Sequence, residues 1–122
     1  IFEFDAMGFV YREIQIPLTA HHDALLIDDN TLLTLDYSLN LQTGEINSGI
    51  PWNNIFNSAN GSAEVRSYGT NDWLHQNTVS WCGDNAILVS SRNQHAVAKL
   101  SYPDFEVEWI LSVNPNGTPI SI

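Results

Sequence analysis

The 122-residue chain carries 14 acidic against 4 basic residues, a net charge of −10 at neutral pH. This acidic balance excludes nucleic acid and anionic membrane surfaces as partners, because both are bound through basic faces. The hydrophobic fraction of 43% is that of a globular protein rather than a disordered tail. No run of the sequence approaches the ~20 apolar residues of a membrane-spanning helix.

Positive charge and cysteine are both scarce. An anionic ligand must be bound by histidines, by backbone amides or by one of the basic residues Arg12, Arg66, Arg92 and Lys99. Cys82 is the only cysteine, which excludes an intrachain disulfide and a cysteine-rich zinc site. Its position after a tryptophan predicts a small buried hydrophobe rather than a nucleophile.

Short runs of β-branched and aromatic residues between turn signals predict strands along most of the chain. The expected strands are 1–4, 9–16, 24–27, 31–36, 39–46 (a hairpin broken at 42–44), 77–81, 86–91, 96–101 and 107–111. No segment keeps helical spacing over three turns. Residues 47–71, rich in Asn, Ser and Gly, predict a long loop. The fold class is therefore expected to be all-β.

The chain also contains an internal repeat. DNTLLT at 29–34 resembles DNAILV at 84–89, and a histidine cluster precedes each: HHD at 21–23 and LHQN at 74–77. Repeats of roughly 40–55 residues made of four short antiparallel strands are typical of β-propeller blades. Chance similarity of turn residues is the alternative, but the recurrence of the histidine cluster at one repeat position favours blades.

We therefore expect residues 1–122 to form one partial β-propeller domain of about two and a half blades. The blade segments are 1–46 and 72–122, separated by the loop at 47–71. So few blades cannot close a ring of the usual ~4–8. The remaining blades are expected from a longer form of the same chain or from another chain, and the open arc alone should be unstable or prone to aggregation.

The candidate site residues belong to the two histidine clusters and to the polar loop after 86–91. In a propeller blade the innermost strand lines the central channel. His22 and His75 each stand just before the first strand of a repeat, so both are expected to face one pocket on the propeller axis. Arg92 ends a strand, and its long side chain can reach the mouth of the same central channel. The structural alternatives are that His75 is a core histidine hydrogen-bonded to a backbone carbonyl, and that Arg92 is an ordinary surface arginine. His21 and His22 predict no metal site, because neighbouring strand residues point to opposite faces.

These segments resemble the bacterial arylsulfate sulfotransferases. The similarity lies in His22-Asp23, in DWLHQNTV at 72–79, and in SSRNQ at 90–94 followed by AVAKL at 96–100; it is specific from about residue 72 to 112 and looser over 1–46. The resemblance implies an exported, periplasmic or secreted, six-bladed propeller without a cofactor. Such an enzyme moves a sulfuryl group from a phenolic sulfate ester to an acceptor phenol through a sulfohistidine.

The resemblance also implies roles for individual residues. His75 and Asn77 match the family's His-x-Asn pair, which contacts the sulfuryl oxygens, Arg92 matches its arginine, and His22 matches its channel histidine, with His21 as the alternative register. The nucleophilic histidine is placed in a later blade and has no counterpart here, because His95 stands in a different motif. This chain alone is thus expected to be inactive. The alternative function is a non-catalytic propeller that binds a ligand or a protein.

Overall fold

The computed structural model describes residues 1–18, 22–57, 74–113 and 119–121. Within them the chain forms eleven strands and one short helix, and the strands make three antiparallel sheets. The two-stranded first sheet contains β1 (Phe2–Phe4) and β2 (Val10–Glu13). The second contains β3 (Ala24–Asp28), β4 (Thr31–Thr34), β5 (Tyr37–Asn40) and β6 (Ile46–Ser48). After α1 (Trp52–Asn57), the third contains β7 (Gln76–Trp81), β8 (Ala86–Ser91), β9 (Ala96–Ser101), β10 (Val107–Val113) and β11 (Pro119–Ser121). The all-β prediction is confirmed.

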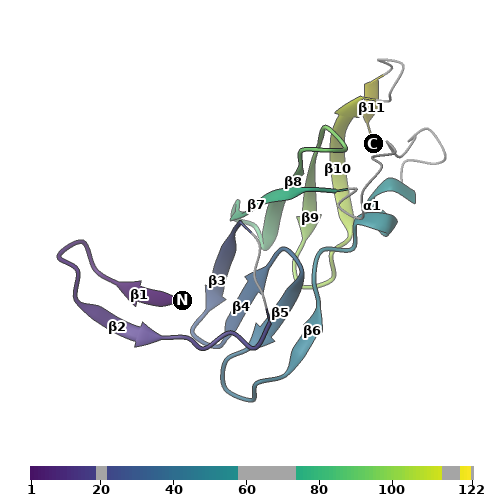
Figure 1. The fold of residues 1–122 in the computed structure, drawn as a ribbon. Helices are drawn as coiled ribbons and strands as arrows, with labels where there is room; N and C mark the ends of the chain where they lie inside the picture. The colour runs from purple at the N-terminus through teal and green to yellow at the C-terminus, as the bar shows by residue number, and fades with distance from the viewer. Residues whose placement is uncertain (19–21, 58–73, 114–118, 122) are drawn as a thin grey trace.

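Consecutive strands are neighbours in every sheet, so each sheet is a simple meander. In Figure 1 the second and third sheets lie next to each other, and the β1–β2 hairpin extends away from them. Strands β3 and β7 are the first strands of their sheets and contact each other. The second and third sheets therefore meet through their leading edges.

The strand predicted over 31–36 ends earlier, at Thr34, because its side chain closes a tight turn. The Thr34 hydroxyl donates to the carbonyl of Tyr37 at 2.9 Å and accepts from the amides of Tyr37 at 3.0 Å and Asp36 at 3.2 Å. A threonine that satisfies three backbone groups in this way reverses the chain within two residues. The predicted single hairpin at 39–46 becomes β5 and β6, with β5 beginning at Tyr37.

Two backbone hydrogen bonds close the turn between β5 and β6, and a third joins it to the turn between β3 and β4. The amide of Leu41 donates to the Asn30 carbonyl at 2.6 Å, that of Gly44 to Asn40 at 2.8 Å, and that of Asn40 to Glu45 at 2.9 Å. Gly44 has a φ of 76°, in the left-handed region that a glycine adopts without strain.

The turn between β9 and β10 repeats this pattern. The amide of Tyr102 donates to the Asn85 carbonyl at 2.7 Å, that of Phe105 to Ser101 at 3.0 Å, and that of Ser101 to Glu106 at 2.9 Å. Phe105 occupies the place of the glycine, with a φ of 56°. The second and third sheets thus share both strand order and turn geometry, so the internal repeat read from the sequence has a structural counterpart.

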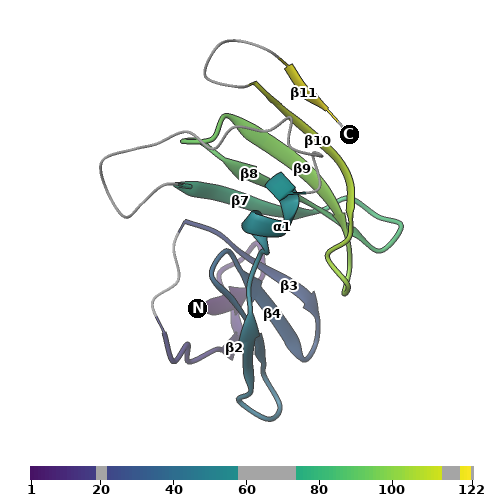
Figure 2. The same cartoon turned by 90° about the vertical axis from the view of Figure 1, so that its right-hand side faces the viewer.

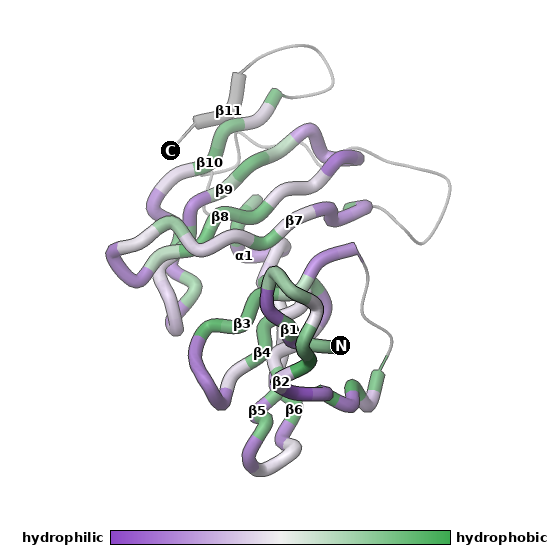
Figure 3. The backbone as a smooth tube through the Cα atoms, turned by 90° about the vertical axis from the view of Figure 1, so that its left-hand side faces the viewer, coloured by the Kyte–Doolittle hydropathy of each residue, from purple (hydrophilic) through white to green (hydrophobic). Residues whose placement is uncertain are grey.

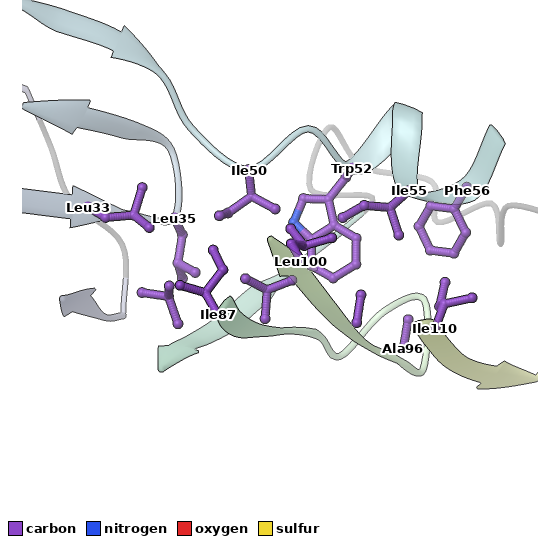
Figure 4. Close-up of a cluster of buried hydrophobic side chains, with 13 residues drawn as sticks. Leu33, Leu35, Ile50, Trp52, Ile55, Phe56, Ile87, Ala96, Leu100 and Ile110 are labelled. Atoms are coloured by element: carbon purple, nitrogen blue, oxygen red, sulfur yellow. The ribbon is translucent and has the colours of Figure 1, made fainter. Parts of the chain in front are cut away.

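The main core lies where the second sheet, α1 and the third sheet meet (Figure 4). Figure 2 shows α1 lying against the third sheet, and Figure 3 shows hydrophobic stretches along β8, β9 and β10. The buried side chains of this core are Leu33, Leu35, Ile50, Trp52, Ile55, Phe56, Val79, Ile87, Val89, Ala96, Ala98, Leu100 and Ile110. In the described part of the chain, no helix is long and apolar enough to cross a membrane.

The loop predicted over residues 47–71 is wrong in its first part. β6 continues to Ser48, and α1 places Trp52, Ile55 and Phe56 in the core. These three residues have the i, i+3, i+4 spacing that puts side chains on one face of a helix. Less than two turns of helix were too few for the periodicity to stand out. Residues 58–71 lie outside the described residues.

Cys82 is exposed, which contradicts its predicted burial. It follows the last residue of β7, and its amide donates to the Ala86 carbonyl at 3.0 Å across the turn into β8. At this point the chain has left the buried face of the sheet. The side chain therefore has no core to enter.

Candidate functional site

Two histidines from different repeats meet where β3 and β7 begin. The Nε2 atoms of His22 and His75 are 3.3 Å apart. Their ring centroids are 5.1 Å apart, and the ring planes are tilted by 54°. The structure therefore brings together the two histidines that the sequence placed at equivalent repeat positions, while their catalytic role stays a prediction.

Both histidines have left-handed backbone conformations. The φ angle is 59° at His22 and 42° at His75. Such a conformation costs a residue other than glycine about 1 kcal/mol or more, and it persists only where the surroundings hold it. Since each strand starts within two residues, the chain bends sharply at the histidine before it enters the sheet. Strained residues of this kind are frequent at binding and catalytic sites.

Asp23 connects the two histidine-bearing segments. Its carboxylate accepts hydrogen bonds from the Thr78 hydroxyl at 2.8 Å and from the Val79 amide at 3.1 Å, both on β7. It also accepts from the amide of Ala24 at 2.9 Å. Because Asp23 directly follows His22, these bonds hold the start of β3 against β7 and so help to fix the distance between the rings.

Arg92 lies beside His75 through the backbone. Its amide donates to the His75 carbonyl at 3.1 Å, and the next amide, of Asn93, donates to the Leu74 carbonyl at 3.1 Å. The Arg92 side chain is exposed, and its Nε donates to the Asn93 side chain at 3.5 Å rather than to either histidine. Among the described carboxylates, none forms an ion pair with it. The guanidinium is thus close in the fold but is not in contact with the histidine pair.

Asn77 is exposed on β7, at the bulge where the register with β8 shifts between Gln76 and Thr78. In the described structure, the side-chain amide of Asn77 forms no hydrogen bond with His22 or His75. His21, the alternative register to His22, lies outside the described residues, as do Asp72 and Trp73 of the segment that resembles the family.

One supporting contact was missed by the sequence analysis. The indole Nε1 of Trp52 donates to the side-chain oxygen of Gln76 at 2.7 Å, which ties α1 to the residue after His75. The i, i+3 spacing of Trp52 and Ile55 is the helical signal in this segment, but over six residues it is too short to predict the helix. It would not have revealed the partner, because the hydrogen bond spans 24 positions of the sequence.

The surface beside the pair is a shallow hollow of about 200 Å³, lined by Ile1, His22, Asp23 and Ala24. In the described ranges, no three residues of the types His, Cys, Asp or Glu are grouped closely enough to hold a metal ion. Imidazole nitrogens at an open surface can donate hydrogen bonds to an oxyanion or transfer a proton. The arrangement therefore suits an anionic group bound directly over the two rings.

Comparison with known proteins identifies a family. The sequence profile of the family described as Arylsulfotransferase (ASST) matches residues 37–116, which is more than half of the chain. The matched span contains His75, Asn77 and Arg92, whereas His22 precedes it. Neither a curated protein nor a solved structure matches the chain.

Proposed function

The chain belongs to the arylsulfotransferase family, and on that premise we propose that it transfers a sulfuryl group from a phenolic sulfate ester to an acceptor phenol. The observation that carries the proposal is the 3.3 Å approach of His22 and His75. Two imidazoles from separate repeats, beside a surface hollow that His22 lines, suit the oxygens of a tetrahedral sulfuryl group. His75 and Arg92 also fall within the span that matches the family.

Each group has a chemical task in this proposal. As sulfur leaves the aryl oxygen, negative charge builds up on the sulfuryl oxygens and on the departing phenolate, as in phosphoryl transfer. The imidazoles of His22 and His75 donate hydrogen bonds to the sulfuryl oxygens, or protonate the phenolate. Arg92 adds a permanent positive charge and a planar set of donors once its side chain turns toward the bound ester. Asn77 supplies a further donor to the substrate.

The transfer proceeds in two displacements through a sulfohistidine. An imidazole nitrogen bonds to sulfur as the sulfur–oxygen bond to the aryl group breaks, and the phenolate takes up a proton. The acceptor phenol then gives up its proton, its oxygen bonds to sulfur, and the nitrogen–sulfur bond breaks. The resemblance assigns that nitrogen to a histidine for which the present sequence has no match, so His22 and His75 act on the oxygens.

We also propose that the second and third sheets are successive blades of a β-propeller. Three observations support this: their shared meander order, their shared turn hydrogen bonds, and the contact between their first strands β3 and β7. In a blade the first strand lines the central channel, which would place the histidine pair at a channel mouth. The periplasmic or secreted location follows from the resemblance alone.

The test is a sulfuryl-transfer assay on the assembled propeller, in which this chain is joined to the blades that carry the nucleophilic histidine, with 4-nitrophenyl sulfate as donor and phenol as acceptor. Release of 4-nitrophenolate should depend on the acceptor. His22→Asn and His75→Asn should each lower kcat/KM by at least about 10²-fold, the effect of deleting one oxyanion donor. Asparagine tolerates a left-handed φ, so these variants remove Nε2 with little added strain.

His95→Asn is the matched control, because His95 is exposed and also has a positive φ, 50°, but contacts neither histidine in the described structure. It should keep wild-type activity. Absence of acceptor-dependent release, or full activity in both His22→Asn and His75→Asn, would refute the proposal. Binding of the ester without turnover would instead favour the alternative function, a non-catalytic binding module.

A further inference from the structure

We propose that one face of the third sheet is the docking surface for a further antiparallel sheet of the same repeat. This open face is made of Leu88, Val97, Trp109 and Leu111. Val97 is 37% exposed, Trp109 36% and Leu111 64%, and Leu88 beside them is half-buried. Exposed apolar side chains that are grouped in this way mark interaction sites. The docking surface is part of the blade arrangement proposed above and rests on that proposal, but it does not depend on sulfuryl transfer.

The strand register places these side chains on the same side of the sheet. Residues directly opposite each other on antiparallel strands share a face. Leu111 is opposite Val97, and Trp109 is opposite Lys99. Lys99 is in turn opposite Leu88. Because side chains two positions apart along a strand also share a face, the two rows form one surface.

The third sheet is therefore apolar on both faces. Its opposite face lies in the main core, through side chains that are at most 3% exposed: Val79, Val89, Ala98 and Ile110. An antiparallel sheet with one face in water alternates apolar residues with polar ones. A sheet that is apolar on both faces is instead an inner layer, with a neighbour on each side.

One charged pair lies on the open face. Lys99 is in the same row as Leu88 and Trp109, and its Nζ is 2.6 Å from the carboxylate of Glu108. Since this charge is already paired, a docked sheet would not have to bury a lone ammonium group. The apolar stem of the lysine also adds to the surface.

The second sheet shows what covers a face of this kind. The repeated segments DNTLLT and DNAILV make Leu32 equivalent to Ile87, and Leu33 equivalent to Leu88. Leu33 is fully buried in the core that the second sheet shares with the third, and so is Ile87 from the other side. Leu88 points to the opposite face of β8 from Ile87. By the repeat, Leu88 should pack on the next sheet as Leu33 packs on the third.

The repeat also indicates the chemistry of the docked sheet. It should offer the kind of apolar face that the third sheet presents to the main core, which is formed by Ile87, Val89, Ala98 and Leu100. A second copy of this chain fits less well. The corresponding face of its second sheet, with Leu32, Tyr37 and Leu39, already packs against Ile14.

The experiment is hydroxyl-radical footprinting of the assembled propeller, read residue by residue by mass spectrometry. Trp81 is the internal control for Trp109, because the two are 42% and 36% exposed in this chain. Trp81 is opposite Ile87, on the side where the second sheet already packs, so a further sheet should not cover it. Trp109 should be labelled severalfold more slowly than Trp81, since a docked interface excludes water.

Leu111→Glu places a charge on the open face. In the assembled propeller it should raise the labelling of Trp109 to the rate of Trp81 and lower the midpoint of thermal unfolding. Ile46→Glu is the matched control, because Ile46 is 41% exposed on β6 and lies outside the open face. It should leave the labelling of Trp109 unchanged.

Labelling of Trp109 at the rate of Trp81 in the wild-type protein would overturn the proposal, and this outcome needs no variant. Protection of Trp109 only in particles that contain two copies of this chain, counted by native mass spectrometry, would show that a second copy covers the face and would overturn it as well. None of these readouts depends on sulfuryl transfer. The docking surface and the proposed reaction can therefore fail separately.

Discussion

The hydroxyl of Thr78 donates a 2.8 Å hydrogen bond to the carboxylate of Asp23, and this bond joins the two sheets beside the histidine pair. The same carboxylate oxygen accepts the Val79 amide at 3.1 Å. Asp23 directly follows His22, and Thr78 lies in β7, the strand that begins directly after His75. The contact between β3 and β7 that positions the two rings thus depends on one carboxylate and its donors.

Thr78→Val should test this dependence. The variant keeps the shape of the side chain but removes one donor from a partly buried carboxylate, so the free energy of unfolding should fall by about 1–2 kcal/mol. Thr78→Ser retains the hydroxyl and should lose less. Urea unfolding measures the stability of both, and the sulfuryl-transfer assay measures whether the pair is still positioned. Equal stability of Thr78→Val and Thr78→Ser would show that the bond does not hold the sheets together.

The sequence predicted the features that local patterns encode. Short runs of β-branched and aromatic residues between turn signals marked the strands of the second and third sheets, and the repeated Asp-Asn turns marked the repeat that both sheets share. The proximity of His22 and His75 followed from their equivalent positions in that repeat. When repeats pack side by side, residues at equivalent positions near their shared edge lie close together, and this is why the contact could be predicted.

Features that depend on contacts between distant segments could not be predicted in the same way. The Asp23–Thr78 bond spans 55 positions, and neither residue differs locally from an ordinary strand residue. The Arg92 side chain is exposed and its Nε donates to the Asn93 side chain, a contact that no periodicity encodes. Helix α1 was missed because one apolar face of six residues is too short to be distinguished from a loop.

Ile55→Ala should test whether α1 belongs to the core. The side chain of Ile55 is fully buried between α1 and the third sheet. Its truncation should lower the free energy of unfolding by about 2–5 kcal/mol, because it removes apolar burial and leaves a cavity. Ile46→Ala is the matched control, since Ile46 is 41% exposed and should change stability by less than about 1 kcal/mol. Similar losses for the two variants, measured by denaturant unfolding, would contradict the packing of α1.

Gly49 is expected to be intolerant of any side chain. A Cβ atom there would lie 2.4 Å from the backbone carbon of Asp36 and 2.7 Å from the amide nitrogen of Tyr37. Neither can move without displacing the start of β5. Gly49→Ala should therefore destabilise the protein by more than Gly83→Ala, whose Cβ meets no atom within 4 Å and whose positive φ costs only about 1 kcal/mol. Comparable midpoints of thermal unfolding for the two variants would refute this expectation.

Tyr37 should make stability sensitive to high pH. Burial and the neighbouring Asp36 carboxylate raise the pKa of the Tyr37 phenol above its ordinary value of 10.0. Below that value the phenol is protonated in both states, so Tyr37 adds no pH dependence to the free energy of unfolding. As the pH rises past it, the unfolded chain ionises first and the folded protein loses stability. Tyr37→Phe should flatten this alkaline loss, although it also removes the 2.9 Å hydrogen bond to the Leu18 carbonyl. Identical slopes of unfolding free energy against pH in both proteins would exclude Tyr37 as the cause.

Arg92→Lys should distinguish a guanidinium that serves the transition state from one that only lies near the site. In the proposed reaction Arg92 donates through a planar fork to sulfuryl oxygens whose charge grows during transfer, and a lysine retains the charge but not the fork. The variant should therefore lower kcat more than it raises KM for the sulfate ester. The Arg92 amide bond to the His75 carbonyl is made by the backbone and survives the substitution.

Arg12→Lys is the control for this comparison. Arg12 is paired with Glu3 on the β1–β2 hairpin at 2.9 Å, and it also donates to the Asp29 carbonyl at 2.7 Å. The same chemical change there should leave kcat and KM unaltered. Steady-state kinetics with 4-nitrophenyl sulfate measures both parameters for the two variants. An unchanged kcat in Arg92→Lys, or an effect confined to KM, would show that the guanidinium does not act on the transferring group, because a residue used only in the transition state must alter turnover.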